Sequence, residues 1–173
     1  AGAAYIPIDP DYPAERIQYM LHDSKAPFVI TNSGLQEQIK FDAQHIVLLD
    51  DNWKTNLKAN DHNPPMISDS GSNAYIRYTS GSTGNPKGVV IRQLSIVNLI
   101  SSFQRILNFS STDKLLAVTT IAFDISELEI FLPLVSGASI YLASRDEAVD
   151  VRLLSKIIET KNITTMQATP ATW

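Results

Sequence analysis

Cysteine is the one residue type that this sequence lacks completely. Its absence excludes disulfide frameworks, thiolate metal sites and thiol nucleophiles. Long apolar runs are also missing, because no stretch reaches the roughly 18 residues that a membrane-spanning helix requires. The opening residues, AGAAYIPIDP, lack the basic start and apolar core of a signal peptide. We therefore expect a cytoplasmic protein with no membrane partner.

An excess of basic residues is likewise absent. The chain has 14 Lys and Arg against 18 Asp and Glu, which leaves a formal charge of −4. Such a balance gives no electrostatic footprint for nucleic acid, so we expect none as a partner. What is present is an ordinary globular composition, 44% hydrophobic and 18% charged, over 173 residues. This length is sufficient for one domain with a sizeable core.

Apolar periodicity alternates along the chain between the spacings of strands and of helices. Helical spacing follows Asp11, an N-cap candidate, with Ile17, Met20 and Leu21 on one face. Further helices are predicted at 94–107, at 125–135 closed by Gly137, and at 151–161, with a poor helix between the first two strands. The predicted strands are 27–32, 45–50, 73–79, 88–91, 114–120, 138–144 and 163–169. Residues 51–72 are predicted to form a polar surface connection. The alternation predicts an α/β fold of mostly parallel sheets flanked by helices.

Residues 78–89, YTSGSTGNPKGV, combine three glycines, several hydroxyls and one lysine after a predicted strand. Gly81, Gly84 and Gly88 would allow positive φ and close approach of backbone N–H groups to an anion, and Lys87 adds a point charge. The spacing matches neither the common phosphate loop nor the dinucleotide fingerprint. By itself the loop is equally consistent with a phosphate site and with a mobile joint.

Asp124 lies where the strand at 114–120 ends and the next helix begins. This junction is the carboxyl edge of a parallel sheet, where ligands usually bind. A helix cap is the simpler interpretation of an aspartate there, so both readings stay open on local grounds. The neighbouring Glu127 and Glu129 are two apart on a helix and cannot face each other. No acid/base pair and no metal-ligand spacing stands out.

Four segments, in order, resemble those of the adenylation domains of nonribosomal peptide synthetases, within the adenylate-forming superfamily that includes acyl-CoA synthetases and luciferases. They are AGAAYIPIDPDYPAERIQYML, YTSGSTGNPKGVV, AFDISELEIFLPLVSGA and ATPATW. The second resembles the signature phosphate loop of the superfamily, and AGAAYIPIDP with FDIS resembles the amino-acid-activating branch. The resemblance implies that residues 1–173 are part of the large N-terminal domain, truncated at both ends and without the small C-terminal domain. We expect such a piece to be inactive and poorly soluble by itself.

The resemblance implies that an amino acid is activated with ATP as aminoacyl-AMP and then passed to the phosphopantetheine of a carrier. A peptidyl carrier domain and a condensation domain are the implied partners in the full chain, and the Mg²⁺ ligand would lie beyond Trp173. Charge develops on the leaving phosphates, so preorganised donors would lower the barrier. Lys87 and Thr83 are the implied catalytic residues. The implied ATP and pyrophosphate ligands are Thr79, Ser80, Gly81, Ser82, Thr83, Gly84 and Lys87.

Asp124 matches the family residue that pairs with the ammonium group of the amino acid. Ile125, Leu128 and Gln167 match further pocket positions, and the four together resemble the pattern associated with glycine. Ile and Leu would fill the space for a side chain and leave a shallow pocket. Glycine is therefore the expected substrate.

Gln93 departs from the family, which usually carries a His shortly after the glycine loop. Glutamine forms hydrogen bonds but does not titrate, so a charged role at this position is in doubt. Two alternatives stay open. One is an acyl- or aryl-CoA ligase of the same superfamily, in which Asp124 meets no ammonium, and the other is a degenerate, non-catalytic module.

Overall fold

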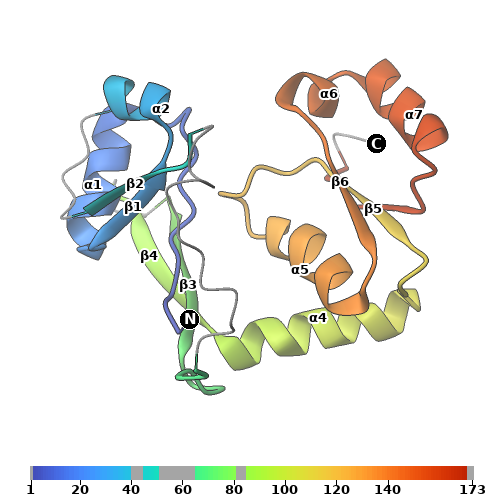
Figure 1. Cartoon of the computed structure of the whole chain (residues 1–173), viewed down its shortest axis with the longest axis horizontal. Coiled ribbons are helices and arrows are strands. Elements are labelled where there is room, and N and C mark those ends of the chain that lie inside the picture. Colours follow the sequence, from blue (N-terminus) through green and yellow to red (C-terminus); the bar gives the residue numbers. More distant parts are fainter. Residues whose placement is uncertain (1, 40–44, 51–64, 81–84, 171–173) are drawn as a thin grey trace. The chain divides into compact units, whose positions relative to one another are not determined.

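A computed structural model of the chain describes residues 2–39, 45–50, 65–80 and 85–170. The chain divides into two compact units, Ala1–Ile91 and Arg92–Trp173. Each unit has its own sheets, helices and hydrophobic core (Figure 1). The predicted class, α/β with mostly parallel sheets flanked by helices, is confirmed.

Helix α1, Ala14–Ser24, is the first element of the first unit, and it buries Ile17, Met20 and Leu21 as the sequence predicts. The prediction that Asp11 caps it is wrong. Pro13 occupies the N-cap position, so Asp11 lies too early in the chain for its side chain to reach the first helical N–H groups. Its own backbone N–H instead donates to Oδ1 of Asp9 over 3.0 Å.

Strands β1, Phe28–Thr31, and β2, His45–Leu48, are parallel neighbours, with Phe28 opposite His45. The short helix α2, Ser33–Gln38, connects them and is capped by Asn32, whose side chain accepts from the Leu35 N–H over 2.9 Å. The sequence predicts buried strands, but Phe28 is 59% and Ile30 67% exposed. Residues 51–64 of the predicted surface connection lie outside the described residues.

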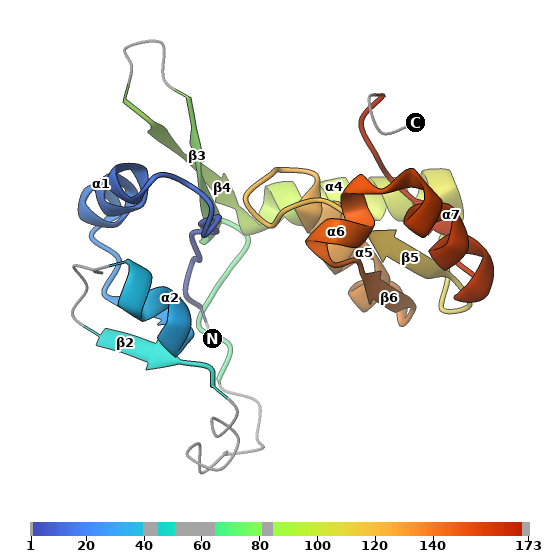
Figure 2. The ribbon, with the colours of Figure 1, turned by 90° about the horizontal axis from the view of Figure 1, so that it is seen from above.

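Strands β3, Asn73–Thr79, and β4, Lys87–Arg92, pair as a hairpin (Figure 2). The predicted bounds of β3 are confirmed, and β4 is one residue longer at each end than predicted. Side chains on both faces of β3 are buried, among them Tyr75 and Tyr78. Tyr5 forms a parallel bridge to Tyr75, so the N-terminal segment covers the strand on that side.

The second unit is built on a parallel sheet of three strands in the order β6-β5-β7. Its strands are β5, Lys114–Ala117; β6, Ser139–Leu142; and β7, Thr165–Met166. Its helices are α4, Gln93–Leu107; α5, Ser126–Ser136; α6, Arg145–Val149; and α7, Val151–Thr160. All three strands are shorter than predicted. Helix α6 was not predicted, although its capping box of Ser144 and Glu147 is a readable signal.

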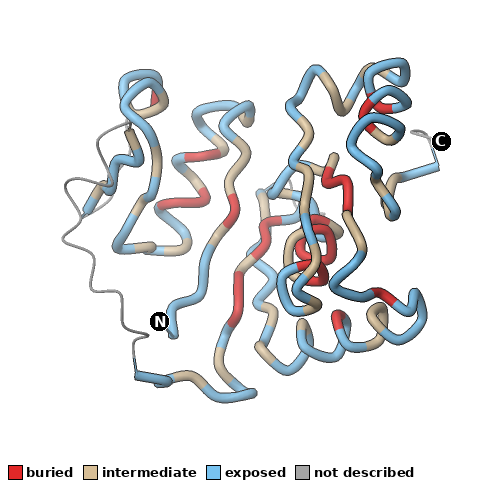
Figure 3. The backbone as a smooth tube through the Cα atoms, turned by 45° about the vertical axis from the view of Figure 1, so that its right-hand side comes forward, coloured by how far each residue is buried: buried red, intermediate tan, exposed pale blue. Residues whose placement is uncertain are grey.

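Side chains of β5 alternate between two apolar clusters. Leu115 and Ala117 pack with Leu128 and Leu132 of α5, whereas Leu116 packs with the α7 cluster of Leu154 and Ile157. Helices therefore cover both faces of the sheet, and Figure 3 shows buried positions along this strand and its helices. Gly137 ends α5 in the left-handed region, with a φ of 67°, as predicted. Among the described helices, none has the length and apolarity needed to cross a membrane.

Candidate functional site

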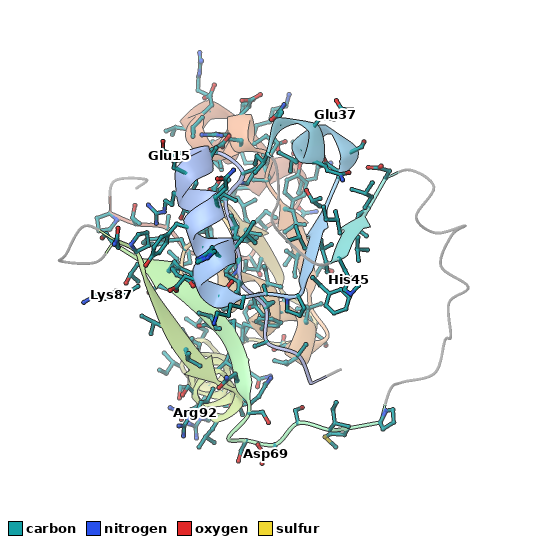
Figure 4. The ribbon with its side chains drawn as sticks, turned by 90° about the vertical axis from the view of Figure 1, so that its left-hand side faces the viewer. Glu15, Glu37, His45, Asp69, Lys87 and Arg92 are labelled. Carbon is teal, nitrogen blue, oxygen red and sulfur yellow. The ribbon has the colours of Figure 1, made fainter. Side chains whose placement is uncertain are left out.

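The predicted phosphate loop joins the two strands of the hairpin in the first unit. Thr79 ends β3 and Lys87 begins β4, and both side chains are exposed, as is Ser80. Lys87 points away from the hairpin (Figure 4) and forms no ion pair with a described residue. Gly81, Ser82, Thr83 and Gly84 lie outside the described residues. The described ends of the loop thus present two hydroxyls and one ammonium group, donors that suit a phosphate.

Gly88 has a different role from the one its sequence context suggests. It is an ordinary strand residue whose φ is not positive, so backbone freedom does not explain the glycine. A Cβ atom at this position would lie 3.2 Å from Cγ2 of Ile76 and 3.3 Å from Cζ of Tyr78. A larger residue would therefore crowd Ile76 and the Tyr78 ring, both on β3, and this close approach of the two strands favours glycine.

Tyr78, one residue before Thr79, is also held by its hydroxyl. The hydroxyl donates to Oδ2 of Asp23, in the last turn of α1, over 2.6 Å. Burial and the adjacent Asp23 carboxylate raise the pKa of Tyr78 well above its ordinary value. The phenol therefore stays protonated and donating at neutral pH, and it ties the end of β3 to α1.

Asp124 lies in the turn between β5 and α5 of the second unit, and it does not cap the helix. Ile125 occupies the N-cap position of α5, with no side-chain capping bond. The Asp124 side chain is exposed and forms no hydrogen bond or ion pair with a described residue. The capping interpretation is therefore wrong, and a carboxylate at the carboxyl edge of a parallel sheet stays available for a ligand.

Hydrogen bonds inside this turn fix its backbone. The Phe123 N–H donates to the carbonyl of Thr120 over 2.9 Å, and the Ser126 N–H donates to the carbonyl of Phe123 over 3.0 Å. The buried Ser126 hydroxyl adds bonds to the carbonyls of Phe123, at 2.6 Å, and Ile121, at 3.2 Å. The segment that carries Asp124 is a series of closed turns.

Two carboxylates that sequence reasoning set aside lie just beyond this turn. Glu127 and Glu129 are buried, with 2% and 0% of their surfaces exposed. Glu129 accepts from both the backbone N–H and the hydroxyl of Thr119. Burial raises the pKa of Glu129, and the Thr119 donors oppose that rise. The sequence did contain a signal for these buried carboxylates, because two acidic residues interrupt the otherwise apolar run SELEIFLPLV.

The other predicted pocket residues belong to the same unit. Ile125 is half-buried, and Leu128 is buried in the cluster between β5 and α5. Gln167 directly follows β7, and its Oε1 atom is buried with no hydrogen-bond partner among the described residues. Because β5 and β7 are parallel neighbours, Asp124 and Gln167 both follow strands at the carboxyl edge of the sheet. A carboxylate and an amide oxygen at this edge supply acceptors for a cationic or donor-rich ligand.

The remaining candidates are Gln93 and any group of side chains that could bind a metal ion. Gln93 is the first residue of α4 and is half-buried. Within the described ranges, no three His, Asp or Glu side chains cluster closely enough to hold a metal ion. The described candidate residues thus fall in both units: Thr79, Ser80 and Lys87 are exposed in the first, and Asp124 is exposed in the second.

Known proteins with similar sequences match this chain over a small part of much longer chains. The chain is 44% identical over 175 residues to a dimodular nonribosomal peptide synthase of Bacillus subtilis (strain 168). It is 39% identical over 171 residues to tyrocidine synthase 3 of Brevibacillus parabrevis. Each match covers 99% of this chain but only 7% and 3% of the two relatives, so the chain spans a small part of their length.

Solved structures show the same fold. The nonribosomal peptide synthetase FmoA3 matches 98% of this chain and 18% of its own, with a TM-score of 0.86 and 26% identity. The four-domain nonribosomal peptide synthetase AB3403, solved with AMP and glycine bound, matches 100% of this chain and 12% of its own. That match has a TM-score of 0.77 and 33% identity. The sequence profile of the AMP-binding enzymes matches residues 1–173, and the chain therefore belongs to the AMP-binding enzyme family, with the fold of the N-terminal part of a peptide synthetase adenylation domain.

Proposed function

We propose that this chain is the part of an adenylation domain that activates an amino acid as its aminoacyl adenylate, using ATP. The observation that carries the proposal is Asp124, an exposed carboxylate in a fixed turn at the carboxyl edge of the sheet, with no capping role. Such a group is placed to pair with the α-ammonium of an amino acid. Relatives that are peptide synthetases support the same class of reaction.

We assign different binding roles to two groups of residues, one for the phosphates of ATP and one for the amino acid. When bound, ATP supplies the α-phosphoryl group that the substrate carboxylate attacks, with pyrophosphate as the leaving group. Thr79, Ser80 and Lys87 would bind that leaving group, because hydroxyl and ammonium donors stabilise the charge that develops on it. Thr83, with Gly81, Ser82 and Gly84, belongs to the same proposed ligand set. Asp124 would hold the amino acid by its ammonium, which orients the carboxylate for attack.

Glycine is the proposed substrate. Ile125, next to Asp124 in the chain, is half-buried, and Leu128 is buried; two bulky apolar residues this near Asp124 in the sequence favour a site with little room for a side chain. Gln167 offers a buried amide oxygen without a described partner. A solved structure with the same fold, that of AB3403, was determined bound to AMP and glycine, which supports glycine as a candidate substrate.

In the full protein we propose that the activated amino acid passes to the pantetheine thiol of a peptidyl carrier domain and then to a condensation domain. The multidomain relatives support this assignment. Mg²⁺ is proposed as the counterion of the ATP phosphates, with its ligand on a part of the domain beyond Trp173. We propose the cytoplasm, where ATP is available, as the compartment.

Amino-acid-dependent exchange between ATP and pyrophosphate tests the proposal, in a protein that continues this chain through the rest of the adenylation domain. Asp124→Ala should lower the exchange rate by about 100-fold or more, because an ammonium group would be left desolvated and unpaired. Asp146→Ala, which removes an exposed carboxylate from α6 of the same unit, is the matched control and should leave exchange unchanged. Wild-type exchange in Asp124→Ala would sink the assignment.

Activation of a carboxylic acid without an amino group is the second candidate. The N-terminal subdomain of Klebsiella oxytoca NpsA, solved in complex with 3-hydroxybenzoyl-AMSN, matches 95% of this chain with a TM-score of 0.80 and 27% identity. Comparing glycine with acetate, and aromatic amino acids with their deaminated acids, separates the two functions. Faster exchange with the deaminated acids, unaffected by Asp124→Ala, would favour an acyl- or aryl-acid ligase.

A further inference from the structure

Glu129 is a fully buried carboxylate to which the proposed reaction assigns no role. None of its surface is exposed, and it lies in the first turn of α5. Its Oε2 accepts from the Thr119 backbone N–H over 3.0 Å, and its Oε1 accepts from the Thr119 hydroxyl over 2.8 Å. Both oxygens of the carboxylate are thus engaged by one residue.

The pair closes the base of the turn that carries Asp124. Thr119 lies two residues beyond the end of β5, and Glu129 lies ten residues further along the chain, in α5. Asp124 falls midway between them. Nearer the tip, the Ser126 hydroxyl bonds to the carbonyls of Ile121 and Phe123. The turn is therefore held at its base by Glu129 and at its tip by Ser126.

Burying a carboxylate in an apolar site costs desolvation free energy. Burial raises the pKa of Glu129, because an environment without water disfavours the charged form. Leu128 and Leu132, one residue before and three residues after Glu129 on α5, are buried in an apolar cluster. An apolar side chain could fill such a position equally well. A carboxylate is needed only because its two oxygens accept hydrogen bonds from both donors of Thr119 at once.

We propose that Glu129 is a positioning residue: it fixes Thr119, and through it the turn that presents Asp124 to the ammonium group of the substrate. This inference rests on the proposed function of Asp124. The Asp124 carboxylate is exposed and has no described partner, so only the backbone of its turn sets its location. A displacement of about 1 Å of a binding group can cost on the order of 100-fold in rate, so the bonds at the base of the turn govern how well the amino acid is bound.

The test measures exchange kinetics in the protein completed through the rest of its adenylation domain. Glu129→Gln keeps the shape of the side chain but sets an amide NH2 against one of the two Thr119 donors. We expect KM for glycine to rise by about 10-fold or more, with KM for ATP changed by less than about twofold. Thr119→Val removes the hydroxyl and keeps the backbone bond, so it should give a smaller rise.

Thr119→Ser is the matched control for Thr119→Val. It retains both donors, so its KM for glycine should equal the wild-type value. A second readout uses an acid without an amino group. With acetate, which has no ammonium for Asp124 to bind, Glu129→Gln should leave KM unchanged. A residue that merely stabilises the fold would alter the kinetics of glycine and acetate alike.

Three outcomes would overturn the inference. Glu129→Gln and Thr119→Val could lower the melting temperature without changing KM for glycine, could change KM for glycine and ATP equally, or could affect acetate as strongly as glycine. If Glu129→Gln does not fold, Thr119→Val and Thr119→Ser still decide the question, because the apolar cluster is untouched in both.

The inference and the proposed function fail in different ways. If Asp124→Ala exchanges pyrophosphate at the wild-type rate, the proposed function fails and the inference fails with it. If Asp124→Ala is inactive while Glu129→Gln keeps the wild-type KM for glycine, only the inference fails.

Discussion

The turn that carries Asp124 and the ends of the predicted phosphate loop are supported differently. In the second unit, buried side chains of α5 bond to the turn at its base and near its tip. In the first unit, the support lies at Tyr78 near the end of β3, whose hydroxyl bonds to Asp23 and whose ring lies close to Gly88. The exposed Thr79, Ser80 and Lys87 come after that support.

This difference matches what each proposed ligand requires. An ammonium group makes a few directional contacts, so a fixed carboxylate binds it best. A pyrophosphate group offers many oxygens, so several hydroxyl and ammonium donors can share its binding. The comparison teaches that the turn carrying Asp124 depends on the core of the second unit, whereas the described ends of the loop depend on the hairpin of the first unit.

Leu132→Ala should have the largest effect on this comparison. Leu132 is completely buried between β5 and α5, so its truncation should destabilise the second unit by about 2–5 kcal/mol. Hydrogen exchange should show lost protection in β5 and α5, with β3 unaffected. Val135→Ala, at a position 62% exposed on the same helix, is the control and should change little. Equal loss of protection in β3 would show that the two units unfold together, which would break the comparison.

Gly88→Ala should have the next largest effect, in the first unit. The added methyl group would crowd Ile76 and the Tyr78 ring, so we expect a loss of about 1–3 kcal/mol in the free energy of unfolding. Urea unfolding followed by circular dichroism measures it. Gly34→Ala in α2, where the nearest atom is 3.5 Å from the added carbon, is the control and should be neutral or stabilising. A stabilised Gly88→Ala would show that the strands do not pack tightly here.

Tyr78→Phe should have the smallest effect at neutral pH, about 1 kcal/mol for the lost hydrogen bond to Asp23. Because the folded-state pKa of Tyr78 is raised above its ordinary value of 10.0, its contribution is complete below that pH and is lost as the pH rises further. Urea unfolding between about pH 8 and about pH 11 should therefore show a steeper alkaline loss in the wild type than in Tyr78→Phe. Tyr12→Phe, which alters a ring stacked under Arg16, is the control. Identical alkaline slopes in wild type and Tyr78→Phe would remove the tyrosine from the support of the hairpin.

Local patterns in the sequence predicted the elements well but their ends and burial less well. The bounds of β3 and the glycine end of α5 follow from local signals, namely a β-branched and aromatic run and a left-handed cap. The short length of β5 does not, because the turn after it is set by bonds from Ser126 and Glu129 on the next helix. The exposure of β1 likewise depends on what packs against it, which periodicity does not reveal.

By itself, the sequence determined the alternation of strands and helices, the order of the resembling segments, and the residue types of both proposed sites. Only the tertiary structure decided that Asp124 does not cap the helix, that Glu129 is buried and hydrogen-bonded to Thr119, and that Gly88 lies close against Ile76 and Tyr78. The physical reason is distance along the chain. Burial and hydrogen bonds join residues such as Tyr78 and Asp23, which are 55 positions apart, whereas sequence patterns report only on neighbours.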